Sequence, residues 1–150
     1  MSNRICFDAS AALAFALTDD PNHSAAKTLI GKLAQQGTLL CAPPLFVCEC
    51  DSVIRLRTWK GTLSAVEASR ARAVLAALQV EIEFALSDQQ RAYEIATQYD
   101  QPRVYDATYA AFAELRMVEM ITADKPFFEA VNGSKCPKNM GPLTFVRLLA

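Results

Sequence analysis

Apolar residues along the chain fall into two alternating kinds of segment. Short runs that are continuously apolar or alternate with polar residues predict strands, because strands inside a covered sheet need little polar surface. Longer segments in which apolar residues recur at helical spacing predict helices. The expected strands are residues 5–7, 39–42, 82–84, 119–122 and 143–148. The expected helices are residues 9–17, about 23–36, 45–59, 62–79, 87–99, 107–115 and 126–131.

The order of these elements predicts an α/β fold. Strands that alternate with helices form a parallel sheet joined by right-handed crossovers, with helices on both faces. The expected architecture is therefore three layers, α/β/α, around a central parallel sheet. The chain has 150 residues, 52% of them hydrophobic, and no linker-like stretch rich in Pro or Gly, so we expect a single domain spanning residues 1–150.

The cysteine content and the start of the chain bear on the cellular compartment in which the protein is expected. Five cysteines are an odd number in a chain that is apolar enough to build a core without disulfides, so reduced thiols in a cytoplasmic protein are expected. Cys48 and Cys50 form a C-x-C pair, but no second Cys/His pair at zinc-ligand spacing accompanies them. Asp8 interrupts the apolar start of the chain, which argues against a signal peptide, and no segment is long and apolar enough for a membrane span.

The net charge is too close to zero for the molecule as a whole to attract a polyanion. Fifteen basic and sixteen acidic residues give a net charge of -1, so binding to nucleic acid would depend on a local surface. The densest basic stretch contains Arg55, Arg57 and Lys60, with Trp59 between them. We hypothesise that the three basic residues contact an RNA backbone, and a solvated helix face is the simpler alternative.

Three aspartates occupy the boundaries between predicted elements. Asp8 and Asp124 follow predicted strands, and ligands of open parallel sheets bind beyond the carboxyl ends of the strands. Asp106 opens a predicted alanine-rich helix. Each of the three has an alternative interpretation as a helix N-cap, whose carboxylate only accepts hydrogen bonds from the first turn.

Glu49 has a less ordinary position. On the helix predicted for residues 45–59 it shares a face with Leu45, Val53 and Leu56, so we expect it to point toward the apolar side. An unpaired buried charge costs several kcal/mol, of the order of a small domain's whole stability. Glu49 therefore needs an arginine, hydrogen bonds or a cation.

Four short motifs together resemble those of the PIN-domain family, in particular the toxins of VapBC-type toxin-antitoxin pairs. The first is Asp8-Ala9-Ser10, and the second is the helix start Pro44-x-x-x-x-Glu49. The third runs from Tyr105-Asp106 to Glu114, and the fourth is Thr122-Ala123-Asp124. The resemblance extends over nearly the whole chain, and the motif order agrees with the predicted α/β fold.

The resemblance implies a metal-dependent ribonuclease. Its site would gather Asp8, Glu49, Asp106 and Asp124 around one or two Mg2+ or Mn2+ ions, with Glu49 as a ligand or as the group that orients the attacking water. Ser10 and Thr122 would orient the carboxylates, although ordinary turn hydroxyls are the alternative. The resemblance further implies a homodimer that cleaves RNA and is neutralised by a small antitoxin protein.

Two other interpretations compete with a nuclease. The first keeps the fold and loses the activity, leaving a PIN-like scaffold that binds RNA or protein; the presence of all four acids argues against it. The second is an unrelated doubly wound enzyme with an aspartate at a strand end. A phosphatase of that kind needs a second Asp where this chain has Ser10, and a receiver domain needs an acidic pair where Asp8 stands alone. No glycine-rich phosphate loop is present either.

Overall fold

The computed structural model describes residues 3–150, and its centre is a sheet of parallel strands. The strand order is β3-β2-β1-β4-β5, and every neighbouring pair is parallel. The strands are β1 (Arg4–Phe7), β2 (Leu39–Ala42), β3 (Glu81–Ile82), β4 (Glu119–Thr122) and β5 (Val146–Leu148). This arrangement confirms the predicted α/β fold with a central parallel sheet.

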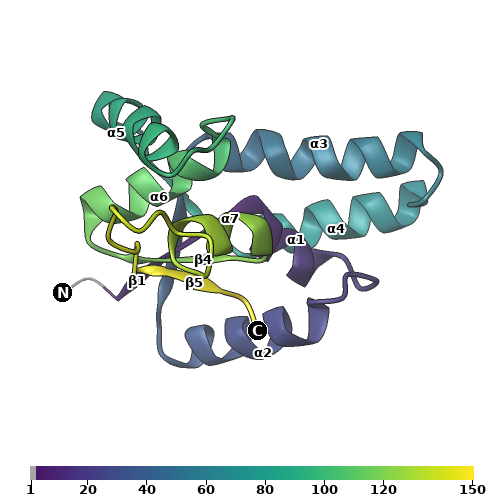
Figure 1. Cartoon of the computed structure of the whole chain (residues 1–150). Helices are drawn as coiled ribbons and strands as arrows, with labels where there is room; N and C mark the ends of the chain where they lie inside the picture. Colours follow the sequence, from purple (N-terminus) through teal and green to yellow (C-terminus); the bar gives the residue numbers. More distant parts are fainter. Residues whose placement is uncertain (1–2) are drawn as a thin grey trace.

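Helices connect the strands and cover the sheet. They are α1 (Ala9–Ala16), α2 (His23–Gln35), α3 (Leu45–Trp59), α4 (Ala65–Ala77), α5 (Leu86–Gln98), α6 (Tyr105–Arg116) and α7 (Lys125–Val131). Figure 1 shows α2 below the sheet and α3, α5 and α6 above it. It also shows α3 and α4 as a helical hairpin that extends beyond the end of the sheet. None of the helices within residues 3–150 is long and apolar enough to cross a membrane.

The core has two parts, one on each face of the sheet, because successive side chains of a strand point to opposite faces. In β1, Ile5 and Phe7 pack with residues of α2, whereas Cys6 packs with residues of α6 on the other face. The alanine-rich segment of α6 is buried along its length, from Ala107 to Ala113. Small side chains there let α6 lie close to the sheet, which places the residues of its first turn next to the strand ends.

The strand order brings two distant loops together. From β1 the chain builds the sheet outward through β2 and β3, and it then returns to place β4 on the opposite side of β1. The strands β1 and β4 therefore flank the point at which the order reverses, where ligands of doubly wound sheets bind. Asp8 follows β1 directly, and Asp124 follows β4 after one intervening residue.

The structure departs from the sequence prediction mainly at the helical hairpin. The sequence predicts a helix at residues 62–79, and α4 forms there, but Ala71 is its only buried residue and Val66 is 79% exposed. Leu75 and the C-cap residue Leu78 are partly buried against the core. The helix lies against α1 and α3 at the periphery rather than on the sheet, so periodicity alone overstated its burial. The N-cap of α5 is Ala85, whose N–H donates to the Asp88 carboxylate, so this helix begins one residue before the predicted start at residue 87.

Candidate functional site

Three of the four predicted acids line one cleft. Asp8, Glu49 and Asp106 share a cleft of about 660 Å³ at the carboxyl ends of the strands. Asp8 comes from the turn between β1 and α1, Glu49 from the beginning of α3, and Asp106 from the first turn of α6. Segments that are far apart in the sequence therefore bring three carboxylates to one surface.

Asp8 caps α1 and also lines the cleft. Its Oδ1 accepts hydrogen bonds from the Ala11 N–H at 2.9 Å and from the Ser10 hydroxyl at 2.7 Å, and the residue is only 2% exposed. Burial raises the pKa of Asp8 to about 6, although hydrogen bonds from Thr122, Ser10 and Ala11 oppose that rise. The charge of Asp124 adds to it. The capping interpretation is thus correct for Asp8 without removing it from the cleft.

Asp106 does not cap its helix. It is the second residue of α6, whose N-cap is Val104, so its carboxylate is not used by the first turn. Burial raises the pKa of Asp106 to about 7, and the charges of Asp124, Asp8 and Glu49 raise it further in that order. Asp8, Glu49 and Asp124 therefore all lie within electrostatic reach of Asp106.

Glu49 faces the cleft and not the apolar core. Glu49 lines the cleft together with Leu45 and Val53, as the predicted helix face requires. The buried residues of α3 are Phe46, Cys50 and Ile54, so that face is not the one that packs on the core. The helix packs with a different face, which leaves Glu49 half-buried at the side. Burial raises the pKa of Glu49, and a hydrogen bond from the Tyr109 hydroxyl, 2.6 Å from Glu49 Oε2, lowers it.

Asp124 belongs to the start of α7 and not to the lining of the cleft. It is the N-cap of α7 and accepts a hydrogen bond from the Phe127 N–H at 2.9 Å. It is not among the residues that line the cleft, yet its charge raises the pKa of both Asp8 and Asp106. Asp124 therefore contributes to the electrostatics of the site while its carboxylate is used as a cap.

Ser10 and Thr122 connect the two loops that carry Asp8 and Asp124. The Ser10 hydroxyl donates to Asp8 and accepts from the Ala123 N–H at 2.9 Å. The Thr122 hydroxyl accepts from the Asp124 N–H at 2.9 Å and lies 3.3 Å from the Ser10 hydroxyl. Ser10 contacts the Asp8 carboxylate, whereas Thr122 accepts from a backbone N–H two residues on, as turn hydroxyls do, so a role in orienting the carboxylates stays a prediction for both residues.

The donor chemistry of the cleft fits a hard divalent cation. Within residues 3–150, no lysine or arginine forms an ion pair with any of the four acids. Mg2+ binds oxygen ligands, often one or two carboxylates plus several waters. In the same residues no three His, Cys, Asp or Glu side chains are grouped closely enough to ligate one ion directly. An ion here would therefore depend on water ligands or on rotation of the carboxylates.

The predicted basic contacts differ in how available they are. Arg57 forms an ion pair with Asp19, with Nη2 2.5 Å from Oδ2, and the same nitrogen donates to the Thr62 carbonyl. Arg55 is exposed on α3, and Lys60 is exposed at the C-cap of that helix. Arg57 is thus held by the loop that follows α1, and a role in RNA binding stays a prediction for all three residues.

Sequence reasoning missed two features of the cleft. Asp20 and Tyr105 also line it, although neither was singled out. Tyr109 was quoted only as part of a motif, yet it provides the hydrogen bond to Glu49. A polar side chain three residues after Asp106, on an otherwise alanine-rich helix, is the signal that could have identified Tyr109.

Comparisons with known proteins give one family match and two solved structures of similar fold. The family model described as PIN domain matches residues 5–133. The crystal structure of PAE2754 from Pyrobaculum aerophilum has a TM-score of 0.65 and 19% sequence identity, covering 89% of this chain and 90% of that one. VapC20 of Mycobacterium tuberculosis, described as a sarcin-ricin loop cleaving toxin, has a TM-score of 0.62 and 20% identity, covering 82% and 92%. No curated protein matches the sequence significantly.

Proposed function

Because the chain belongs to the PIN-domain family, we propose that it is a divalent-metal-dependent endoribonuclease that hydrolyses RNA phosphodiester bonds. The observation that carries the proposal is the convergence of Asp8, Glu49 and Asp106 on one cleft, with Asp124 within electrostatic reach. A cluster of acids without a basic partner is destabilised by its own repulsion unless protons or a cation neutralise it. Such a cluster is consistent with a site for a cation.

The residues proposed to hold Mg2+ or Mn2+ are Asp8, Asp106 and Asp124, directly or through water, with Glu49 as a further ligand or as the group that orients the attacking water. When bound, such an ion supplies a Lewis acid that neutralises developing charge on the phosphoryl oxygens and makes water more acidic. The protein itself supplies fixed carboxylates: Ser10 and Ala11 hold Asp8, and Tyr109 holds Glu49.

We propose that the half-buried carboxylate of Glu49 accepts the proton of the attacking water. One of its oxygens accepts the Tyr109 hydrogen bond, so the other is available to accept a hydrogen bond from water in the cleft. A carboxylate whose pKa is raised by burial is a better proton acceptor than an exposed one. No covalent intermediate with the protein is needed in this scheme.

The biological context is also part of the proposal. We propose that the chain is one domain and a toxin of the VapBC type, acting in the cytoplasm as a homodimer and neutralised by a small antitoxin protein. The structural similarity to VapC20 supports this context. Exposed apolar side chains such as Val66, Trp59 and Leu86 provide surface that partners could cover.

Incubation of the purified protein with structured RNA and Mn2+ tests the activity. We expect cleavage that Asp8→Asn abolishes and that EDTA prevents. Asp100→Asn is the matched control, because Asp100 is exposed and has φ 52°, a conformation that asparagine tolerates. Cleavage by the Asp8→Asn protein at the wild-type rate would contradict the proposed site. Binding of RNA without cleavage by the wild type would favour the silent scaffold.

A further inference from the structure

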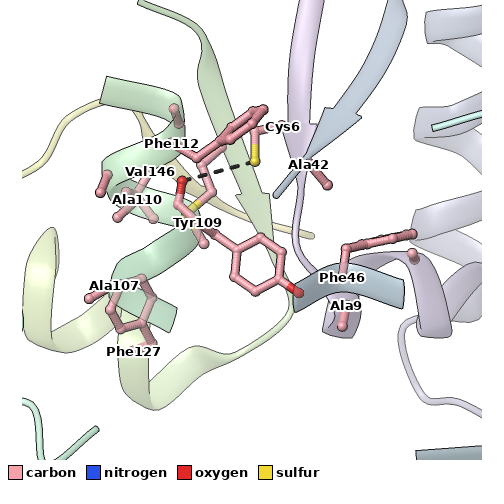
Figure 2. Packing of buried hydrophobic residues seen from close by; sticks show 14 of the residues in the cluster. Cys6, Ala9, Ala42, Phe46, Ala107, Tyr109, Ala110, Phe112, Phe127 and Val146 are labelled. Atoms are coloured by element: carbon pink, nitrogen blue, oxygen red, sulfur yellow. Dashed lines mark hydrogen bonds between the residues drawn. The ribbon is translucent and has the colours of Figure 1, made fainter. Parts of the chain in front are cut away.

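Tyr109 is a polar residue buried in the core beside the cleft. It is fully buried, and its ring belongs to the hydrophobic cluster that contains Phe112 and Phe127. Figure 2 shows the ring extending away from α6, with the hydroxyl directed toward the segments that carry Phe46 and Ala9. At that end the hydroxyl donates to Glu49 Oε2 over 2.6 Å. Tyr109 is therefore an internal link from α6 to α3.

The packing of the ring fixes where the hydroxyl lies. Protein cores are packed densely, so a fully buried ring has little freedom to move. A half-buried glutamate, by contrast, has several rotatable bonds and loses considerable freedom when it is held in one conformation. The hydrogen bond therefore holds the otherwise mobile Glu49 carboxylate at the place set by the Tyr109 hydroxyl.

The same helix also carries a second acid of the cleft. Asp106 and Tyr109 are three residues apart on α6, so their side chains leave the helix on neighbouring positions of one face. Asp106 reaches the cleft directly, and Tyr109 reaches Glu49. A single rigid helix therefore sets the position of one carboxylate and, through a hydroxyl, the position of another that comes from α3.

We propose that Tyr109 is a positioning residue of the site, which holds the Glu49 carboxylate at a fixed place relative to Asp106 and thereby prepares the cleft for a divalent cation. This inference rests on the proposed function. A purely structural role is the competing explanation, because a buried phenol usually needs a hydrogen-bond acceptor whatever that acceptor does.

Tyr109→Phe removes the hydroxyl and keeps the buried ring. The matched control is Tyr99→Phe, which also removes a hydroxyl from a buried ring, in this case one that donates to the Gly141 carbonyl at 2.5 Å. Mn2+ affinity is measured by titration calorimetry on both variants and on the wild type. We expect Tyr109→Phe to weaken Mn2+ binding about 10- to 100-fold, as loss of a group that orients a ligand does elsewhere, and Tyr99→Phe to leave it unchanged.

A double-mutant cycle with Glu49→Gln distinguishes a role of Tyr109 in positioning Glu49 from a purely structural role of Tyr109. If Tyr109 acts through Glu49, adding Tyr109→Phe to Glu49→Gln produces no further loss of Mn2+ affinity. An equal loss in both backgrounds overturns the inference, and so does wild-type affinity in the Tyr109→Phe protein. Failure of the wild type to bind Mn2+ at all overturns the proposed function and this inference with it, so the two failures are distinguishable.

Discussion

The hydroxyl oxygens of Ser10 and Thr122 lie 3.3 Å apart, although 112 residues separate them in the sequence. This contact joins the loop after β1 to the loop after β4. Each hydroxyl also contacts a residue of the acidic cluster: Ser10 donates to Asp8, and Thr122 accepts from the Asp124 N–H. The relative position of Asp8 and Asp124 is therefore set by side-chain hydrogen bonds as well as by strand pairing.

Thr122→Val should weaken both the fold and the site. Valine has nearly the shape of threonine but leaves the Asp124 N–H without its acceptor, and Thr122 is fully buried. We expect the free energy of unfolding to fall by about 1–3 kcal/mol and Mn2+ affinity to fall about tenfold or more. Urea unfolding and calorimetry measure the two effects. Thr97→Val, at an exposed site on α5, is the control; equal losses in both variants would refute a specific role for Thr122.

Asp106→Asn should stabilise the metal-free protein at alkaline pH. The pKa of Asp106 is about 7 in the folded protein against a usual 3.8. Between pH 3.8 and about pH 7, the Asp106 carboxyl is protonated in the folded state and ionised in the unfolded state. The free energy of unfolding therefore falls as pH rises through this range, and it stops falling above about pH 7. Asparagine carries no charge, so the neighbouring carboxylates do not repel it. Because Asp106 is partly solvated, we expect a gain of about 1–3 kcal/mol near pH 8 that vanishes near pH 4.

Urea unfolding in EDTA at the two pH values measures this gain, with Asp100→Asn as the control for removal of an acid. A gain that is the same near pH 4 and near pH 8 would show that the amide improves packing and that charge repulsion is not the cause.

Binding of Mn2+ should release protons and depend on pH in the same range. Burial holds the pKa of Asp8 at about 6 and that of Asp106 at about 7 in the metal-free protein, and carboxylates bind a cation in their ionised form. We expect affinity to rise between about pH 5 and about pH 8, and a Mn2+ concentration 100 times the Kd to stabilise the fold by about 2.7 kcal/mol. Calorimetry in two buffers of different ionisation enthalpy measures the released protons. Affinity that is independent of pH would place the ion elsewhere.

Much of the fold could be predicted from the sequence because strong local signals mark its boundaries. Proline and glycine enclose the helix predicted from Leu45 to about Trp59, and α3 spans Leu45–Trp59. The strands at residues 39–42 and 119–122 were likewise predicted with their observed limits. Periodicity failed for α4, since an apolar face indicates helix but not whether a sheet lies beneath it.

The candidate site could be predicted less completely, for two physical reasons. Asp8 and Asp124 each cap a helix and also belong to the acidic cluster. Sequence reasoning treats these two roles as alternatives and therefore cannot choose between them. Tyr109 is a buried aromatic residue in a core helix, and its role depends on an acceptor 60 residues away in the sequence. The spacing from Asp106 can draw attention to Tyr109, but only tertiary structure shows that Glu49 is its acceptor.

Arg116→Ala should destabilise the protein strongly without touching the cleft. The Arg116 guanidinium donates to both carboxylate oxygens of Asp88, at 2.9 and 3.1 Å, and to Glu83, and it lies over the Phe112 ring. The Asp88 side chain is only 4% exposed, so removing Arg116 leaves a buried charge unpaired. We expect a loss of about 3–5 kcal/mol in urea unfolding. Arg147→Ala, which breaks the exposed pair with Glu119, should cost under about 1 kcal/mol.

The salt dependence of RNA binding distinguishes the three basic residues of the stretch from Arg55 to Lys60. Each phosphate neutralised by a free cationic side chain contributes about 0.7 to 0.9 to the slope of log K against log salt. Arg55 and Lys60 are exposed, whereas the charge of Arg57 is already balanced by Asp19. In an inactive Asp8→Asn background, we therefore expect the Arg55→Ala/Lys60→Ala variant to lower the slope by about 1.5 and Arg57→Ala to lower it by much less. Unchanged slopes in both variants would mean that RNA approaches the acidic cleft along a different surface.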